Sequence, residues 1–186
     1  MNRRTMLTTA TVALASASTL GLGAGEASAA TQASFVDTTF ILEAAQALQL
    51  EIALANVAKT RATRADVKAY ATQVATDLTK QLKLLKAQAT ALGVTLPTQT
   101  DPTQQALVDA LGKVATADVD FQYIFQQVND LTTYGVHNGL FDRGRVKAQA
   151  KGLRSYFAHA LPVIRKELNA AQAILTNLPG GTAALA

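Results

Sequence analysis

The sequence predicts an all-α fold, an antiparallel bundle of four long helices with one short extra helix in the crossover between the second and third. The chain has 186 residues, enough for one ordinary domain. Apolar residues make up 49% and aromatic residues only 5%, and much of the apolar share is alanine. This balance favours close-packed helices over sheets. Apolar residues also recur at helical spacing through long segments without proline or glycine.

Residues 1–29 are typical of a signal peptide. A short positive start with Arg3 and Arg4 precedes an uncharged stretch over residues 5–25, and Ala27-Ser28-Ala29 forms a small-residue cleavage site. We expect cleavage before Ala30 and export to the periplasm or cell envelope. An uncleaved membrane anchor is the alternative, although threonine, serine and glycine make the stretch weaker than a spanning helix. No other segment is expected to be long and apolar enough to span a membrane.

The arginine pair also indicates an export route. Arg3-Arg4 followed by Thr5, Met6 and Leu7 resembles the twin-arginine pattern, in which two arginines precede one variable residue and two apolar ones. Proteins on that route cross the membrane already folded. An ordinary secretion signal remains the other interpretation.

The first helix of the mature chain is predicted over residues 35–59, where proline and glycine are absent. A second helix follows, opened by Thr63 and Asp66 in an arrangement like a capping box. Gly93 is a natural C-cap, and Pro97 lies just beyond it. The apolar stripes are Ile41, Ala44, Leu48, Ile52 and Ala55 in the first helix, and Val67, Ala71, Val74, Leu78, Leu82, Leu85, Ala89 and Leu92 in the second.

The short crossover helix is predicted to begin at Asp101-Pro102 and to end near Leu111, because aspartate caps a helix start and proline suits its first position. The next helix carries an apolar stripe and ends near the turn-forming residues 135–139. The last helix is predicted over residues 146–175 with a kink at Pro162. The two stripes are Phe121, Ile124, Val128 and Leu131, and then Leu153, Phe157, Ala160, Ile164, Leu168, Ala171 and Leu175. The bundle domain would span residues 30–178, with a loose tail over residues 179–186.

Composition and charge exclude several functions. Without cysteine the chain has no disulfide, thiolate-ligated metal or cysteine nucleophile. The net charge of +4 falls to about +3 once the leader is removed, too little for a dedicated nucleic-acid binder. The densest basic run is interpreted as a solvated helix start. The alternative is weak contact with an anionic envelope surface of lipid headgroups, polysaccharide or phosphate. That run is Arg143, Arg145, Lys147, Lys151 and Arg154.

No catalytic motif is present. The Glu-x-x-His pairs that build di-iron sites in helical bundles are absent. The two histidines are interpreted as a turn residue, His137, and a boundary residue, His159. Neither Ser34 nor Ser155 has a histidine placed by any known pattern to act as its base. Gly180-Gly181 lies in the tail and forms no phosphate-binding loop. We therefore predict no catalytic residue and no cofactor.

Several short motifs nevertheless resemble a known family. The pieces are Ala71-x-x-Val74-x-x-Asp77, Leu82 and Leu85, Gly93-Val94-x-Leu96-Pro97, Asp120-x-x-Tyr123, and Leu161-Pro162. Together they resemble the ferritin-like bacterial family called domain of unknown function 4142, whose members are often labelled as outer membrane proteins. The resemblance covers roughly residues 35–174. It implies a ferritin-like four-helix bundle in the cell envelope without an established activity.

This chain departs from the family at three positions. Family members typically carry histidine directly after the aspartate of the second helix, eight residues after the tyrosine, and five residues after the proline of the last helix. Here those positions hold Leu78, Leu131 and Glu167. Leu78 and Leu131 fall on the apolar stripes, so we expect the family histidines to point inward. Leucine packing would then replace part of a polar interior.

Five residues remain as weak candidates for a metal site: Glu51, Asp77, Asp120, Tyr123 and Glu167. Our preferred interpretation is structural, with these side chains holding helix ends and neighbouring helices together. The function we expect is therefore a non-enzymatic binding or structural role in the envelope. The alternatives are a divergent ferritin-like metal-binding or redox protein, and a carrier of a small apolar ligand held in a gap near Pro162.

Overall fold

The computed structural model describes residues 32–135 and 138–184, and this part of the chain is helical with no strand. The leader predicted over residues 1–29 and His137 lie outside the described residues. The predicted all-α class is confirmed. The elements are α1 (Phe35–Arg61), α2 (Ala65–Ala91), α3 (Pro102–Lys113), a 3₁₀ turn η1 (Thr116–Asp118), α4 (Val119–Gly135), α5 (Leu140–Lys147), α6 (Lys151–Thr176) and α7 (Gly181–Ala184).

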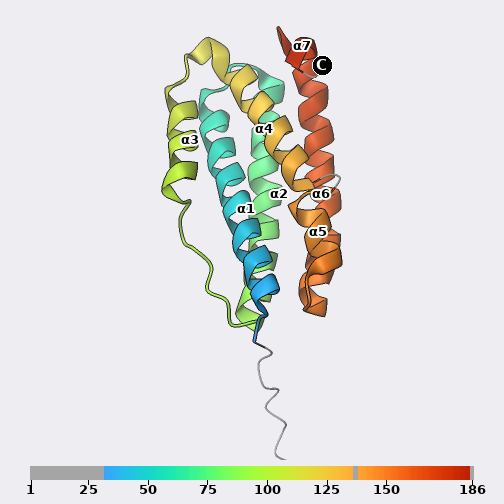
Figure 1. Ribbon diagram of the computed structural model, residues 1–186. Coiled ribbons are helices and arrows are strands. Elements are labelled where there is room, and N and C mark those ends of the chain that lie inside the picture. The colour runs from blue at the N-terminus through green and yellow to red at the C-terminus, as the bar shows by residue number, and fades with distance from the viewer. Residues whose placement is uncertain (1–31, 136–137, 185–186) are drawn as a thin grey trace, which may run out of the picture.

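Four long helices form the body of the molecule (Figure 1). Helix α1 packs against α2 and α4, and α6 packs against the same two helices. The short helix α3 lies on the outer side of α1, connected to α2 by a long crossover, while α5 packs against α6. In the predicted tail, α7 contacts α6 and α4.

The helix boundaries follow local capping chemistry in most places. Ser34 and Asp101 accept backbone N–H bonds at the starts of α1 and α3. Gly93 adopts a positive φ of 70° just after α2, where the Val94 N–H binds the Ala89 carbonyl at 2.8 Å. The predicted C-cap and the Asp101-Pro102 start are therefore confirmed.

The predicted capping box at Thr63 and Asp66 is wrong. Helix α2 begins after Arg64, which makes no side-chain capping bond. Asp66 instead accepts bonds from the exposed Arg64 guanidinium at 3.0 and 2.7 Å. A carboxylate from another helix supplies the missing cap, a long-range contact that local sequence spacing does not reveal.

The predicted last helix also starts too early at residue 146. The chain forms α5, breaks at residues 148–150, and begins α6 at Lys151. The break is explained by Asp37 of α1, whose carboxylate accepts the N–H groups of Gln149 at 2.6 Å and Ala150 at 3.1 Å. These bonds fix the start of α6 against α1. Helix α6 then continues through Pro162.

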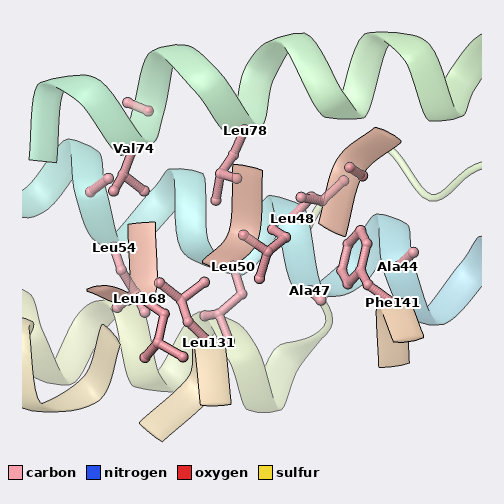
Figure 2. Packing of buried hydrophobic residues seen from close by; sticks show 14 of the residues in the cluster. Ala44, Ala47, Leu48, Leu50, Leu54, Val74, Leu78, Leu131, Phe141 and Leu168 are labelled. Carbon is pink, nitrogen blue, oxygen red and sulfur yellow. The ribbon is translucent and has the colours of Figure 1, made fainter. Parts of the chain in front are cut away.

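A single hydrophobic core joins all four long helices (Figure 2). Leucines and small alanines fill the space between α1 and α2, where Ala44, Ala55 and Ala71 are fully buried. Aromatic rings close the end near α5, where Phe157 contacts Phe40 at 5.8 Å and Phe141 at 5.5 Å between ring centroids. Phe141 and Phe157 therefore bridge α5 and α6.

Helix α1 meets the length and composition test for a membrane span, with a mean hydropathy of 1.3 over its most apolar window. The expectation that no segment after the leader would do so was wrong. However, 56% of that window is buried inside the structure, and α1 carries the buried carboxylates of Asp37 and Glu51. A core helix passes the same test, so this finding alone is weak evidence for a span.

Candidate functional site

A buried group of polar side chains lies between the four long helices, and we call it the central polar cluster. Each helix contributes at least one member, and every member is at most 5% exposed. Polar side chains in such a position need partners, because an unsatisfied polar group in an apolar interior is costly. The members are Glu51 on α1, Tyr70 on α2, Tyr123 and Gln127 on α4, and Glu167 on α6.

Hydrogen bonds connect most of the cluster. The Gln127 amide donates to the Glu51 carboxylate. The Tyr70 hydroxyl lies 3.2 Å from the backbone oxygen of Glu167 and 3.4 Å from Gln127 Oε1. Burial raises the pKa of the Tyr70 and Tyr123 hydroxyls well above their usual values. Burial therefore favours the neutral form of both phenols.

Glu51 faces a second carboxylate, Asp130, across the α1–α4 contact. Burial raises the pKa of Glu51 well above its usual range, and Asp130 raises it further, against an opposing hydrogen bond from Gln127. Burial also raises the pKa of Asp130. Glu51 Oε1 has no hydrogen-bond partner in the described part of the chain. The raised pKa favours the neutral, protonated form of this buried carboxyl group.

A second acidic group lies toward the surface between α2 and α6. Asp77 accepts bonds from Gln73 at 2.6 Å and from Lys166 at 3.0 Å. Burial raises the pKa of Asp77, but these hydrogen bonds outweigh it and hold the pKa at about 2. Lys166 Nζ also lies 3.3 Å from Glu167 Oε1, an ion contact without hydrogen-bond geometry. Asp77 and Lys166 therefore join α2 to α6 electrostatically.

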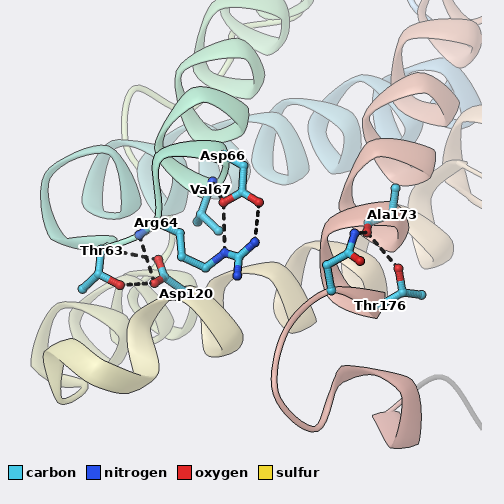
Figure 3. A network of polar contacts seen from close by, with 8 residues as sticks. Thr63, Arg64, Asp66, Val67, Asp120, Ala173 and Thr176 are labelled. Atoms are coloured by element: carbon cyan, nitrogen blue, oxygen red, sulfur yellow. Dashed lines mark hydrogen bonds and ion pairs between the residues drawn. The ribbon is translucent and has the colours of Figure 1, made fainter.

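Asp120 on α4 caps the start of α2 (Figure 3). Its carboxylate accepts the backbone N–H groups of Thr63 at 3.0 Å and Arg64 at 3.2 Å, together with the Thr63 hydroxyl. The carboxylate also interacts favourably with the positive end of the helix dipole. Asp120 thus fastens α4 to the beginning of α2, as Asp37 fastens α1 to the beginning of α6.

Comparison with family models shows the family of this chain. The model described as Domain of unknown function (DUF4142) matches residues 22–174, which is most of the sequence. The chain belongs to this family. No curated protein and no solved structure gives a significant match. Membership in DUF4142 establishes the family to which the chain is related, but it identifies no activity.

The three positions where this DUF4142 chain lacks the expected histidines are all interior. Leu78 and Leu131 are 0% exposed and Glu167 is 1% exposed. Figure 2 shows Leu78 and Leu131 among the core side chains. At two of these positions a leucine therefore packs where a histidine would need hydrogen-bond partners.

The five candidate metal ligands are distributed over different contacts in this DUF4142 chain. Glu51, Tyr123 and Glu167 lie in the central polar cluster, whereas Asp120 is engaged at the start of α2 and Asp77 with Lys166. Among the residues that the structure describes, no group of three or more histidine, aspartate or glutamate side chains is placed to hold a metal ion.

Four important polar residues escaped the sequence analysis: Asp37, Tyr70, Gln127 and Asp130. One signal was available for Gln127, because it occupies a stripe position, three residues after Ile124 and four before Leu131. A polar side chain at such a position predicts a buried hydrogen bond. The partners of Asp37 are more than a hundred residues away along the chain, and spacing gives no signal for them.

The remaining predicted residues lie at the surface. His159 is exposed, with Nδ1 2.7 Å from the Ser155 carbonyl oxygen. Arg143 and Arg154 donate to backbone carbonyls near the ends of α5, and Arg145 pairs with Asp142 at 2.7 Å. Two adjoining hollows of ≈ 690 and ≈ 720 Å³ lie beneath the crossover and share Gln49, Leu82 and Thr98 in their walls. They do not lie at Pro162, where a ligand gap was expected.

Proposed function

We propose that this DUF4142 protein is exported to the periplasm or cell envelope and acts there as a non-enzymatic binding or structural protein. Its mature part would be a ferritin-like four-helix bundle. The signal-peptide pattern of residues 1–29 supports export. The closed circuit of contacts from α1 to α2, α6, α4 and back supports the bundle arrangement.

The observation that carries the proposal is the packing of Leu78 and Leu131. Both are fully buried at positions where the family resemblance implies inward-pointing histidines. A leucine supplies packing but neither a ligand atom nor a proton. Their placement supports an interior that joins helices, with no reactive group at these two positions.

The carboxylates that remain also favour a structural role. Asp37 binds backbone N–H groups at the start of α6, and Asp120 binds backbone N–H groups at the start of α2. In both cases the partner lies far away along the chain. Asp77 is held by Lys166 of α6. These groups are occupied by contacts that stabilise the fold, and redirecting them to a ligand would break those contacts.

Export is tested by expressing the full-length chain, fractionating the cells and determining the N-terminus of the product by mass spectrometry. The proposal predicts a periplasmic or envelope-associated chain that begins at Ala30. A matched pair of leader variants, R3K/R4K and T5S, would show whether the twin-arginine route is used. An unprocessed chain in the cytoplasm would contradict the proposal.

A second function, metal binding or redox chemistry in a divergent ferritin-like site, is favoured by one observation. Within the described residues, the buried Tyr123 hydroxyl and the Oε1 atoms of Glu51 and Glu167 have no hydrogen-bond partner. Thermal unfolding with added iron, zinc or manganese tests it, because a ligand that binds only the folded state raises Tm. A rise in Tm that is lost in Glu51→Gln and kept in the exposed control Glu43→Gln would favour this second function over the first.

A further inference from the structure

Four chain segments meet at one end of the molecule, which we call the basic end. The Ala33 N–H binds the Leu92 carbonyl at 3.0 Å, so the start of α1 lies beside the end of α2. The bonds from Asp37 to Gln149 and Ala150 place the junction between α5 and α6 there as well. Figure 1 shows these helix ends together at the lower end of the view.

Positive charge is concentrated in the segments that meet at this end. Residues 83–95 and 142–154 carry seven basic side chains and one acidic one, Asp142, which is paired with Arg145. The beginning of α1 adds the buried Asp37 and the exposed Glu43. These segments together carry a net charge of +4, so the net positive charge of the mature chain, about +3, is concentrated here. The seven basic residues are Lys83, Lys86, Arg143, Arg145, Lys147, Lys151 and Arg154.

Exposed apolar side chains lie among these charges. Phe35, in the first turn of α1, is 87% exposed, and Val146, in the last turn of α5, is 61% exposed. Lys147 follows Val146 in the sequence and Lys151 begins α6, and both are exposed and form no ion pair within the described residues. A single exposed apolar residue is ordinary, but an aromatic and an aliphatic side chain exposed at an end of the molecule that also carries free ammonium groups have the chemistry that an interfacial lipid contact requires.

The direction of the chain adds an independent argument. Phe35 is the sixth residue of the chain expected after cleavage before Ala30, and the uncharged residues 5–25 precede it in the sequence. A bundle delivered through a membrane by that leader therefore has its basic end joined to the segment that engages the membrane.

We propose that the basic end docks on an anionic lipid surface. Phe35 and Val146 enter the headgroup region, and Lys147 and Lys151 contact lipid phosphates. This inference rests on the proposed function, because only an exported chain meets the envelope lipids from that side. Docking keeps the processed protein at the membrane after the leader has been removed.

General magnitudes give the expected contribution of each lysine and each apolar side chain to vesicle binding. One lysine near an anionic surface strengthens binding roughly five-fold, and the effect is screened by salt. Loss of one partly inserted aromatic side chain weakens binding by about ten-fold. Both kinds of group should act together on vesicles that carry anionic lipid.

The test uses the full-length chain expressed with its leader, purified as the cell leaves it, with its N-terminus determined by mass spectrometry. Co-sedimentation is measured with vesicles of equal parts phosphatidylglycerol and phosphatidylcholine, and with pure phosphatidylcholine, at low and high salt. The variants are F35S and the pair K147Q/K151Q. The matched controls are L107S and K59Q/K113Q, which change exposed residues away from the basic end.

The proposal expects binding to anionic vesicles that falls about ten-fold in F35S and roughly 25-fold in K147Q/K151Q, with both controls unchanged. Binding that both controls weaken equally would overturn it. So would binding to a soluble polyanion that competes fully with vesicles and does not depend on Phe35. If vesicle binding is absent from a chain that is exported and processed, the docking inference fails while the proposed function stands. Vesicle binding by a chain that stays in the cytoplasm would contradict the proposed function instead.

Discussion

The Gln127 amide on α4 donates a hydrogen bond to the buried carboxylate of Glu51 on α1. Burial raises the pKa of Glu51, and the half-buried Asp130 on α4 raises it further. An ionised Glu51 would be costly in this apolar interior. The folded protein therefore favours the protonated form of Glu51.

The raised pKa of Glu51 makes folding stability depend on pH. Because the pKa of Glu51 is raised in the folded state, the folded protein binds more protons than the unfolded chain once the pH exceeds about 4.3. Stability is fully present below the ordinary pKa of glutamate and falls as the pH rises toward the raised value. Urea unfolding at pH 5 and pH 8 should show that Glu51→Gln removes much of this decline. A decline in Glu51→Gln as steep as in the unmodified protein would contradict a protonated Glu51.

Folding stability should be sensitive to the buried carboxylate of Asp120, which is only 5% exposed. Asp120→Ala removes a cap from α2 and leaves the Thr63 and Arg64 N–H groups without their partner, at a cost of roughly 1–3 kcal/mol in the free energy of unfolding. Asp66→Ala is the control, because the exposed pair of Asp66 with Arg64 contributes roughly 0–1 kcal/mol. Chemical denaturation measures both. Equal losses in the two variants would argue against the cap.

Replacing the buried Leu78 by histidine should weaken this protein. Leu78→His introduces a polar ring where the side chain is 0% exposed, and the expected loss is roughly 2–4 kcal/mol at neutral pH. The loss should grow as the pH falls through the usual pKa of histidine, because the charged ring is harder to bury. Leu84→His on the same helix is the control, since Leu84 is 53% exposed. A Leu78→His variant as stable as this control would show that the interior still accepts a polar group.

The contact between α5 and α6 depends on a glycine. A Cβ at Gly144 would lie 2.5 Å from the Phe157 ring, so Gly144→Ala should lower stability by roughly 1–3 kcal/mol. Gly112→Ala in α3 is the control: a Cβ there meets nothing within 4 Å, and alanine should stabilise the helix by about 0.5–1 kcal/mol. Thermal unfolding distinguishes them, and a neutral Gly144→Ala would mean that α5 can move away from Phe157.

The sequence was sufficient to predict the elements that depend on local chemistry. Periodic apolar residues identified α1 and α2, and Asp101 and Gly93 marked helix ends whose caps involve only neighbouring residues. The break between α5 and α6 was missed because it depends on Asp37, more than a hundred residues away. The same reason explains the wrong cap of α2, where Asp120 acts from another helix.

The candidate site was predicted less completely than the fold. Glu51, Tyr123 and Glu167 were named as candidates, and all three lie in the central polar cluster. Their partners Tyr70, Gln127 and Asp130 were missed, since a buried hydrogen bond between helices depends on register and rotation that periodicity alone does not fix. Asp77 and Asp120 were grouped with them by family position, yet they serve separate contacts in the structure.

The most direct test of the central claim is elemental analysis of the processed protein, purified without chelators from the envelope of the cells that make it. We predict well under one transition-metal ion per chain, with the same result for Glu51→Gln, because leucine packing and a protonated Glu51 leave few ligand atoms in the centre of the bundle. About one iron, zinc or manganese ion per chain, lost in Glu51→Gln but retained in Glu43→Gln, would contradict it and establish a metal site among the buried carboxylates.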